Sequence, residues 1–293
     1  MQRLAGKRLV VLGCGYLGGA LARAAVAEGA RVTALTRNPA TATELREAGV
    51  ETVVADLAEA GWHQQIAGEP DFLVNCVSSG GGGIEAYRRS YVAGMASMVA
   101  WAERRGAAGT AVYTSSTSVY PQGEGAKVDE MAPTGGSERA ALLLAAEDWL
   151  RRGREAWKRA FVLRLAGLYG PGRWHLVDQV RSGFVSGSGG HRLNLVHRDD
   201  AAGAVLACLL APSQVEGGVF NVADDGAAAK SEVVAWLAQR LGVAMPGFAG
   251  VALSGRRPVT PDRLIMNHAA KVRLGWQPRY PTFREGFDSF MSR

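Results

Sequence analysis

Short apolar runs alternate with helix-type patterns over the first 165 residues, and this alternation constrains the fold more than any other feature of the chain. Runs this apolar are typical of strands buried on both faces, and strands separated by helices form parallel sheets. Right-handed crossovers then favour a doubly wound α/β fold. The predicted strands are KRLVVLG, RVTALTR, ETVVADL, DFLVNCVSS, GTAVYTSS and RAFVLRLAG, with a weak helix expected near residues 60–68.

The pattern changes after Gly170, where glycine-rich loops separate shorter elements. We predict a nucleotide-binding domain over residues 1–170, to which residues 193–212 return. Residues 171–192 and 213–293 are predicted to form a smaller C-terminal α/β lobe that binds substrate. Ligands of doubly wound folds lie at the carboxyl ends of the strands, so this lobe is expected to cover that edge.

Charge and composition restrict the function classes. The net charge of +6 favours a small anionic substrate, but the basic residues are scattered and no nucleic-acid motif appears. The three cysteines form no metal-ligand pattern, so no metal site is predicted and a reducing cytoplasm is expected. No apolar run reaches the ~20 residues of a membrane span, and the first predicted strand begins too early for a signal peptide.

Gly13, Gly15 and Gly18 form G-x-G-x-x-G between a predicted strand and a predicted helix. Gly13 allows a tight turn, Gly15 lets the backbone approach a pyrophosphate, and Gly18 lets the helix pack closely on the strand. The helix N-terminus offers amides to the anion. A glycine-rich turn without a ligand is the alternative. In this context the motif indicates a Rossmann-type dinucleotide site.

The end of the second predicted strand bears on which dinucleotide binds. An NAD site usually has a carboxylate there, whereas this chain has Thr36 and then Arg37. An arginine pairs with a 2′-phosphate, so NADP is favoured over NAD; the alternative is a solvent-facing Arg37. Asp56, after the third strand, either meets the adenine or caps the next helix.

Ordered motifs along nearly the whole chain resemble the extended short-chain dehydrogenase/reductase superfamily, which includes the nucleotide-sugar epimerases and dehydratases. The form GCGYLG and the segments RLAGLYGPGR and GWQPRYPTFREGF are most similar to an atypical branch, the bacterial YeeZ-like proteins. The other matching segments are VADL, NCVSS, YTSSTSVYP, LNLVHRDDAAGAV and VFNVADD. The resemblance implies a Rossmann-type doubly wound parallel sheet with a smaller C-terminal α/β substrate lobe.

The resemblance also assigns cofactor-binding residues. Tyr16, Leu17 and Leu57 join the glycine loop, Arg37 and Asp56 in this set. The strand end at Val77, Ser78 and Ser79 would pass the cofactor ribose and phosphates. Thr114 and Ser115 would lie near the nicotinamide ribose, and the nicotinamide ring would be flanked by Leu165, Ala166 and Leu168. His197 and Asn221 would have structural roles.

The resemblance fails at the catalytic pair. Active members carry Tyr-x-x-x-Lys on the helix after the serine-rich strand, and a glutamate usually follows the lysine by four. Counting back from Glu147 places Leu143 at the lysine position and Arg139 at the tyrosine position. Arg139 remains protonated, so it cannot act as a general acid or base. No tyrosine occurs between Pro121 and Tyr169, so the absence does not depend on the register.

Several groups could replace the pair. Ser116 and Ser118 occupy the usual serine position, and His175 is the preferred substitute acid. Tyr91, Tyr120 and Tyr169 are alternatives, although a packed tyrosine is the more common case. A phosphorylated substrate could be received by Arg173, Arg192, Arg256, Arg257 and Arg263.

Two functions therefore remain open. One is an NADP-dependent oxidoreductase or epimerase-type enzyme with displaced catalytic groups. The other is a dinucleotide-sensing regulator without catalysis. Small residues in YVAGMASMVAWAERRG and SERAALLLAAEDWL permit close helix packing, so a homodimer is also expected to be feasible.

Overall fold

A seven-stranded parallel sheet forms the centre of the computed structural model, which describes residues 2–106, 108–153, 155–250 and 261–291. The order is β12-β7-β5-β4-β1-β2-β3, and every neighbouring pair is parallel. The predicted Rossmann-type doubly wound fold is confirmed. The strand bounds are β1 Arg8–Leu12, β2 Arg31–Thr36, β3 Glu51–Val54, β4 Phe72–Asn75, β5 Ala108–Ser116, β7 Trp157–Leu165 and β12 Gly217–Val222.

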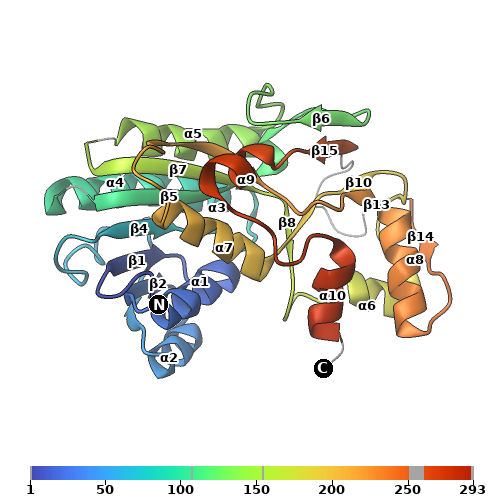
Figure 1. Ribbon diagram of the computed structural model, residues 1–293, viewed down its shortest axis with the longest axis horizontal. Helices are drawn as coiled ribbons and strands as arrows, with labels where there is room; N and C mark the ends of the chain where they lie inside the picture. Colours follow the sequence, from blue (N-terminus) through green and yellow to red (C-terminus); the bar gives the residue numbers. More distant parts are fainter. Residues whose placement is uncertain (1, 107, 154, 251–260, 292–293) are drawn as a thin grey trace.

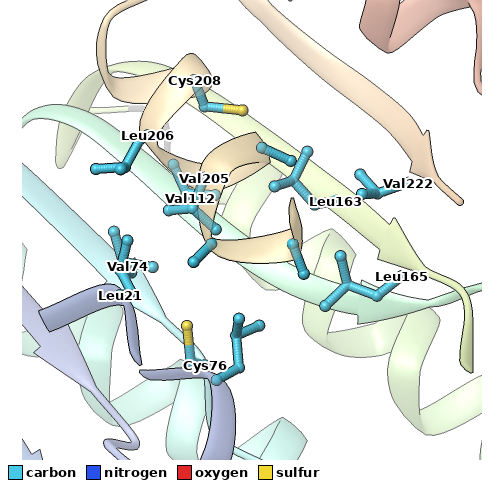
Figure 2. Packing of buried hydrophobic residues seen from close by; sticks show 14 of the residues in the cluster. Leu21, Val74, Cys76, Val112, Leu163, Leu165, Val205, Leu206, Cys208 and Val222 are labelled. Atoms are coloured by element: carbon cyan, nitrogen blue, oxygen red, sulfur yellow. The ribbon is translucent and has the colours of Figure 1, made fainter. Parts of the chain in front are cut away.

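Helices cover both faces of this sheet (Figure 1). One face carries α1 (Tyr16–Ala27), α2 (Pro39–Glu47) and α7 (Arg198–Leu209), and the other carries α4 (Gly94–Arg105) and α5 (Glu138–Arg152). The first face buries one apolar cluster. Figure 2 shows Leu21 of α1 and Val205 of α7 with Val74, Val112 and Leu163 of the strands in this cluster. Burial of this kind contributes about 1.5–3 kcal/mol for each large apolar side chain.

The strand β12 corrects one expectation. Residues 217–222 were placed in the C-terminal lobe, but β12 pairs along its whole length with β7 at the edge of the large sheet. Val222 packs in the same cluster as Leu163 (Figure 2). This pairing has two causes. β12 buries apolar side chains on the sheet, and it supplies hydrogen-bond partners to backbone groups of β7 that would otherwise be unsatisfied. The weak helix near residues 60–68 is absent, and turns occupy that segment.

The helical run after β4 is interrupted by one wide turn. Helix α3 (Gly83–Tyr87) is followed by the π-helix η1 (Arg88–Ala93) and then by α4. π turns inside α-helices are rare and occur frequently at functional sites. η1 packs against α5, the helix that carries Arg139 and Leu143.

A separate group of helices lies beyond one end of the sheet (Figure 1, right). Its apolar cluster joins Val177 and Val180 of α6, Val233 of α8, and Phe287 and Phe290 of α10. The remaining elements are η2 Thr117–Val119, β6 Ala126–Val128, β8 Gly167–Tyr169, α6 His175–Arg181, β9 Phe184–Val185, β10 Arg192–Leu193, β11 Leu195–His197, β13 Ala228–Ala229, α8 Lys230–Leu241, β14 Gly247–Phe248, β15 Arg263–Ile265, α9 His268–Leu274 and α10 Phe283–Met291.

Candidate functional site

A cleft of about 710 Å³ follows the carboxyl ends of β1, β2, β4, β5 and β7. This is where a doubly wound sheet binds ligands, because the loops that leave neighbouring strands diverge there. Most of the residues assigned to a cofactor from the sequence line this one cleft. They are Gly13, Gly15, Tyr16, Leu17, Arg37, Asp56, Leu57, Val77, Ser78, Thr114, Ser115, Leu165, Ala166 and Leu168.

The three glycines of the loop differ in what surrounds them. Gly13 has φ +87°, and a Cβ there would lie 2.6 Å from the backbone of Val77. A Cβ on Gly18 would lie 2.4 Å from the carbonyl oxygen of Gly13, so Gly18 packs behind the loop rather than lining the cleft. A Cβ on Gly15 would meet no atom within 4 Å. The open side of the loop therefore lies at Gly15, where a pyrophosphate fits against the N-terminus of α1.

The end of β2 continues directly into the N-terminus of α2. Asn38 caps this helix by accepting a hydrogen bond from the amide of Ala40 at 2.9 Å, and Pro39 occupies the first turn. The cleft wall here consists of Thr36, Arg37, Asn38, Pro39 and Thr41. A cation beside a helix N-terminus, with no carboxylate at the strand end, is an environment that favours an anion.

Asp56 stands between two arginines. Its Oδ2 lies 3.1 Å from Arg89 Nε and 3.9 Å from Arg37 Nη1, and its Oδ1 accepts the amide of Ala58 at 2.9 Å. Partial burial opposes ionisation of this carboxyl, but the Ala58 amide and Arg89 outweigh it and hold its pKa below the usual value. Asp56 thus caps a turn rather than a helix, and it also lines the cleft.

The hydroxyls at the end of β5 already have partners within the protein. Thr114 donates to the carbonyl oxygen of Asn75 at 3.2 Å, and Ser115 donates to Glu147 Oε1 at 2.7 Å. Ser116 Oγ accepts the amide of Ser118 at 3.1 Å and caps η2. Ser116 lines the cleft, whereas Ser118 does not.

A buried ion pair lies behind these hydroxyls. Arg164 on β7 donates from Nη2 to Glu147 Oε2 at 2.7 Å and from Nε to Oε1 at 3.1 Å. The same guanidinium donates to the hydroxyl of Tyr120 at 2.9 Å, and Tyr120 donates to Asn221 Oδ1 at 2.8 Å. Burial works against the charge of Arg164, but Glu147 outweighs it and keeps its pKa raised. This network fixes the ends of β5, β7 and β12 relative to α5.

The two residues at the positions of the missing pair take other roles. Leu143 is 2% exposed and belongs to the apolar cluster that also contains Val119 and Tyr120. The guanidinium of Arg139 lies over the ring of Tyr87, 5.2 Å from its centroid. Neither residue lines the cleft.

The other proposed substitutes separate into two groups. His175 is exposed at the start of α6, where its Nε2 lies 2.8 Å from Gln179 Nε2, and it does not line the cleft. Tyr120 is engaged with Arg164 and Asn221, and Tyr169 is buried against Phe287. Tyr91 does line the cleft. Ser79 lies outside the lining residues, beside Tyr91.

Three of the five arginines suggested for substrate lie within the described residues, and one of these three reaches the cleft. Arg173 lines it, with its guanidinium 4.1 Å from the ring centroid of Tyr16. Arg192 pairs with Asp262 at 2.7 Å, and the buried Arg263 donates to the carbonyl oxygen of Thr117 at 3.0 Å. Arg256 and Arg257 lie outside the described residues.

The sequence reasoning missed several lining residues. Cys14, Leu35 and Cys76 are apolar parts of the walls, and Asn38, Pro39, Thr41 and Ser90 are polar or helix-start positions. Position next to a recognised motif could have identified Cys14 and Asn38. Nothing in the local pattern marks Ser90, which lies in the π-helix η1, because a π turn produces no recognisable periodicity.

The sheet order, the glycine turn and the cleft at the strand ends define the class: a dinucleotide-binding α/β protein of the Rossmann type. The chain belongs to the NAD dependent epimerase/dehydratase family, whose model matches residues 9–223. The resemblance to the extended and atypical short-chain dehydrogenases/reductases is thereby confirmed.

Relatives agree with this placement. The protein YeeZ of Escherichia coli (strain K12) is 31% identical over 170 residues, a match that spans 58% of each chain and so less than two thirds of that protein. A 3-diazoavenalumate denitrifying reductase of Streptomyces sp is 28% identical and is matched over 95% of this chain and 98% of its own.

Solved structures of similar fold cover nearly the whole chain. A putative NAD-dependent epimerase/dehydratase from Methylobacillus flagellatus is 25% identical, covers 98% of both chains and superposes with a TM-score of 0.74. MoeE5 in complex with UDP-glucuronic acid and NAD is 21% identical, covers 97% of this chain and 98% of its own, and has a TM-score of 0.82.

Two further features bear on the class of site. Among the described residues, no helix is long and apolar enough to cross a membrane. The same part of the chain holds no group of three or more His, Cys, Asp or Glu side chains placed to hold a metal ion.

Proposed function

We propose that the protein is an NADP(H)-dependent oxidoreductase of the epimerase/dehydratase type that acts on a small anionic carbonyl compound, with nucleotide sugars and phosphorylated compounds as the first candidates. The observation that carries this proposal is the continuous cleft from the glycine loop to Ser116 and Leu168. The full-length similarity to a denitrifying reductase supports the redox class.

The preference for NADP rests on the end of β2. Arg37, Asn38 and the N-terminus of α2 face the cleft together, and no carboxylate follows β2 directly. A 2′-phosphate placed there would gain a guanidinium and a helix N-terminus. Asp56 is held by Arg89 and Arg37, so its charge is partly balanced before any phosphate arrives.

Replacing Arg37 by alanine tests this preference. We expect the Kd for NADPH to rise about 30-fold, close to the ~2 kcal/mol of a charge-assisted hydrogen bond, while the Kd for NADH changes little. Isothermal titration with both nucleotides measures this. Arg46→Ala is the matched control, because Arg46 is exposed in the last turn of α2, the helix that follows Arg37, and does not line the cleft. Equal weakening of both nucleotides would contradict the assignment.

The oxidoreductase itself is tested with NADPH and a panel of nucleotide sugars and carbonyl compounds, by following absorbance at 340 nm and hydride exchange with deuterated NADPH. We expect turnover or exchange with at least one member. Tight binding without either reaction would count against the enzyme.

One observation favours a second candidate, a dinucleotide-sensing regulator. Leu143 is buried in an apolar cluster and Arg139 lies over Tyr87, so α5 retains no acid–base group at the positions of the pair. A sensor binds NADPH without turnover and changes its conformation or its affinity for a partner on binding. A Kd for NADPH above ~1 mM would contradict this candidate, because the site would stay empty at cellular concentrations.

A further inference from the structure

The π-helix η1 directs two consecutive side chains to the cleft. Ser90 and Tyr91 both line it, although neighbours along an α-helix point about 100° apart. The wider turn, with its i→i+5 bonds, accompanies this arrangement. The cofactor assignments do not explain it, because neither residue belongs to the glycine loop or to a strand end.

Tyr91 lies beside the part of α5 where the catalytic pair is missing. Its ring centroid is 5.1 Å from that of Tyr87, over which the guanidinium of Arg139 lies. Tyr91 also packs against the apolar cluster that contains Leu143 and against the one that contains Tyr113. The phenol of Tyr91 on η1 therefore lies close to the part of α5 where the family's catalytic tyrosine is absent.

The hydroxyls at the end of β5 and that of Tyr16 are engaged elsewhere or lie at the other end of the cleft. Thr114 and Ser115 donate to Asn75 and Glu147, and Ser116 caps η2. Tyr16 belongs to the first turn of α1 beside the pyrophosphate position, under the guanidinium of Arg173. Among the described residues that line the cleft, Tyr91 is the phenol away from the glycine loop.

We propose that Tyr91 donates the proton to the substrate oxygen, in place of the tyrosine absent from α5. This inference rests on the proposed function. NADPH held at the glycine loop would supply the hydride to the carbonyl carbon and would thereby become NADP⁺. The O–H bond of Tyr91 breaks as the C=O π bond opens, and its proton forms the new O–H bond of the alcohol. Solvent then returns a proton to the Tyr91 phenolate, so charge and atoms balance.

The surroundings of Tyr91 keep it protonated at neutral pH, as a donor must be. Burial raises its pKa above the usual value, and the neighbouring Tyr87 adds to the rise, while hydrogen bonding by Ser79 opposes it. The groups that face it are Tyr87 on its own helical run, Ser79 on the loop after β4 and Tyr113 on β5; Arg139 on α5 lies beyond Tyr87.

The first test measures the phenol directly and requires no substrate. Tyrosine ionisation is followed at 295 nm in the wild type and in Tyr91→Phe, each alone, with NADP⁺ and with 2′-phospho-ADP-ribose, which lacks nicotinamide. The positive charge of oxidised nicotinamide should lower the pKa of one tyrosine in the wild type by about 1 unit. We expect no such shift with 2′-phospho-ADP-ribose or in the variant. A shift that persists in Tyr91→Phe, or no shift at all, overturns the proposal.

The second test measures single-turnover reduction of 4-nitrobenzaldehyde by bound NADPH. Tyr91→Phe retains the ring but loses the proton, so we expect the rate to fall at least about 100-fold, the usual contribution of a general acid. The Kd for NADPH should stay within about threefold. Tyr87→Phe is the matched control, since the ring of Tyr87 meets that of Tyr91 at a tilt of 58° without lining the cleft. Its rate should stay within about threefold of the wild-type rate, because the phenol of Tyr91 is retained.

The two tests separate the two proposals. A wild type that reduces no carbonyl compound yet shows the nicotinamide-dependent shift contradicts the oxidoreductase and leaves Tyr91 placed beside the nicotinamide. A wild type that reduces the aldehyde at an unchanged rate in Tyr91→Phe overturns the role of Tyr91 alone. Wild-type rates should also decline as pH rises through the pKa of Tyr91, and this decline should be absent from any residual rate of the variant.

Discussion

Glu147→Ala is expected to lower the free energy of unfolding by about 3–5 kcal/mol, the usual cost of removing one partner of a buried ion pair. Glu147 is 1% exposed and accepts both hydrogen bonds from Arg164, whose side chain is 7% exposed. Alanine would leave this guanidinium buried without its counter-ion, and Ser115 would lose its acceptor. Urea unfolding followed by circular dichroism measures the change.

Two comparisons show whether the cost comes from the buried charge. Asp148→Ala, one residue further along α5, removes only exposed ion pairs to Arg151 and Arg152 and should cost less than about 1 kcal/mol. The double variant Glu147→Leu with Arg164→Met removes both charges and should recover most of the stability, since apolar replacements of buried pairs are often neutral. Equal losses for Glu147→Ala and Asp148→Ala would contradict the prediction.

The ion pair of Glu147 and Arg164 also shows which contacts local sequence patterns do not predict. The sequence places Glu147 at a fixed spacing on its helix, and α5 and β7 are both predicted. Which strand residue faces the carboxylate depends on how β7 sits in the sheet, and no periodicity encodes that register. Arg164, inside an apolar run, could equally have been read as a residue that points to solvent.

The strands and helices of the sheet, by contrast, could be predicted from the sequence. Buried parallel strands and their helices are defined by short windows of residues, so the six predicted strands correspond along the chain to β1, β2, β3, β4, β5 and β7. β12 belongs to this sheet, although its residues fall in the segment that is predicted to form the C-terminal lobe. Residues 166–216 separate the end of its partner β7 from the start of β12, so no local pattern indicates that these two strands pair.

In the candidate site, too, residues identified by their position in a local pattern were predicted better than residues chosen for their chemistry. Residues next to the glycine motif or at strand ends line the cleft, because every parallel strand delivers its carboxyl end to one edge. His175 was chosen for its chemistry, but it begins a helix that directs it to solvent. Tyr91 was only one of three tyrosines considered, since a π turn leaves no mark in the hydrophobic pattern.

Gly15→Ala is expected to weaken NADPH binding about 100-fold, or ~2.7 kcal/mol, while the protein remains folded. A Cβ at this position meets no atom within 4 Å, so the methyl group has room in the protein itself. The same empty space is where the pyrophosphate must approach the loop amides, and the methyl group would hold it away from them. Fluorescence titration with NADPH and thermal unfolding without it measure the two effects.

Gly19→Ala is the matched control on the same helix. Its Cβ would make ordinary contacts, 3.5 Å from Arg23 Nη1 and 3.9 Å from the carbonyl oxygen of Cys14, and Gly19 does not line the cleft. We expect unchanged binding and equal or slightly higher stability, because alanine forms helices better than glycine. Wild-type affinity in Gly15→Ala would place the cofactor phosphates elsewhere. Loss of binding in both variants would show that the helix, and not the open side of the loop, responds to the added methyl group.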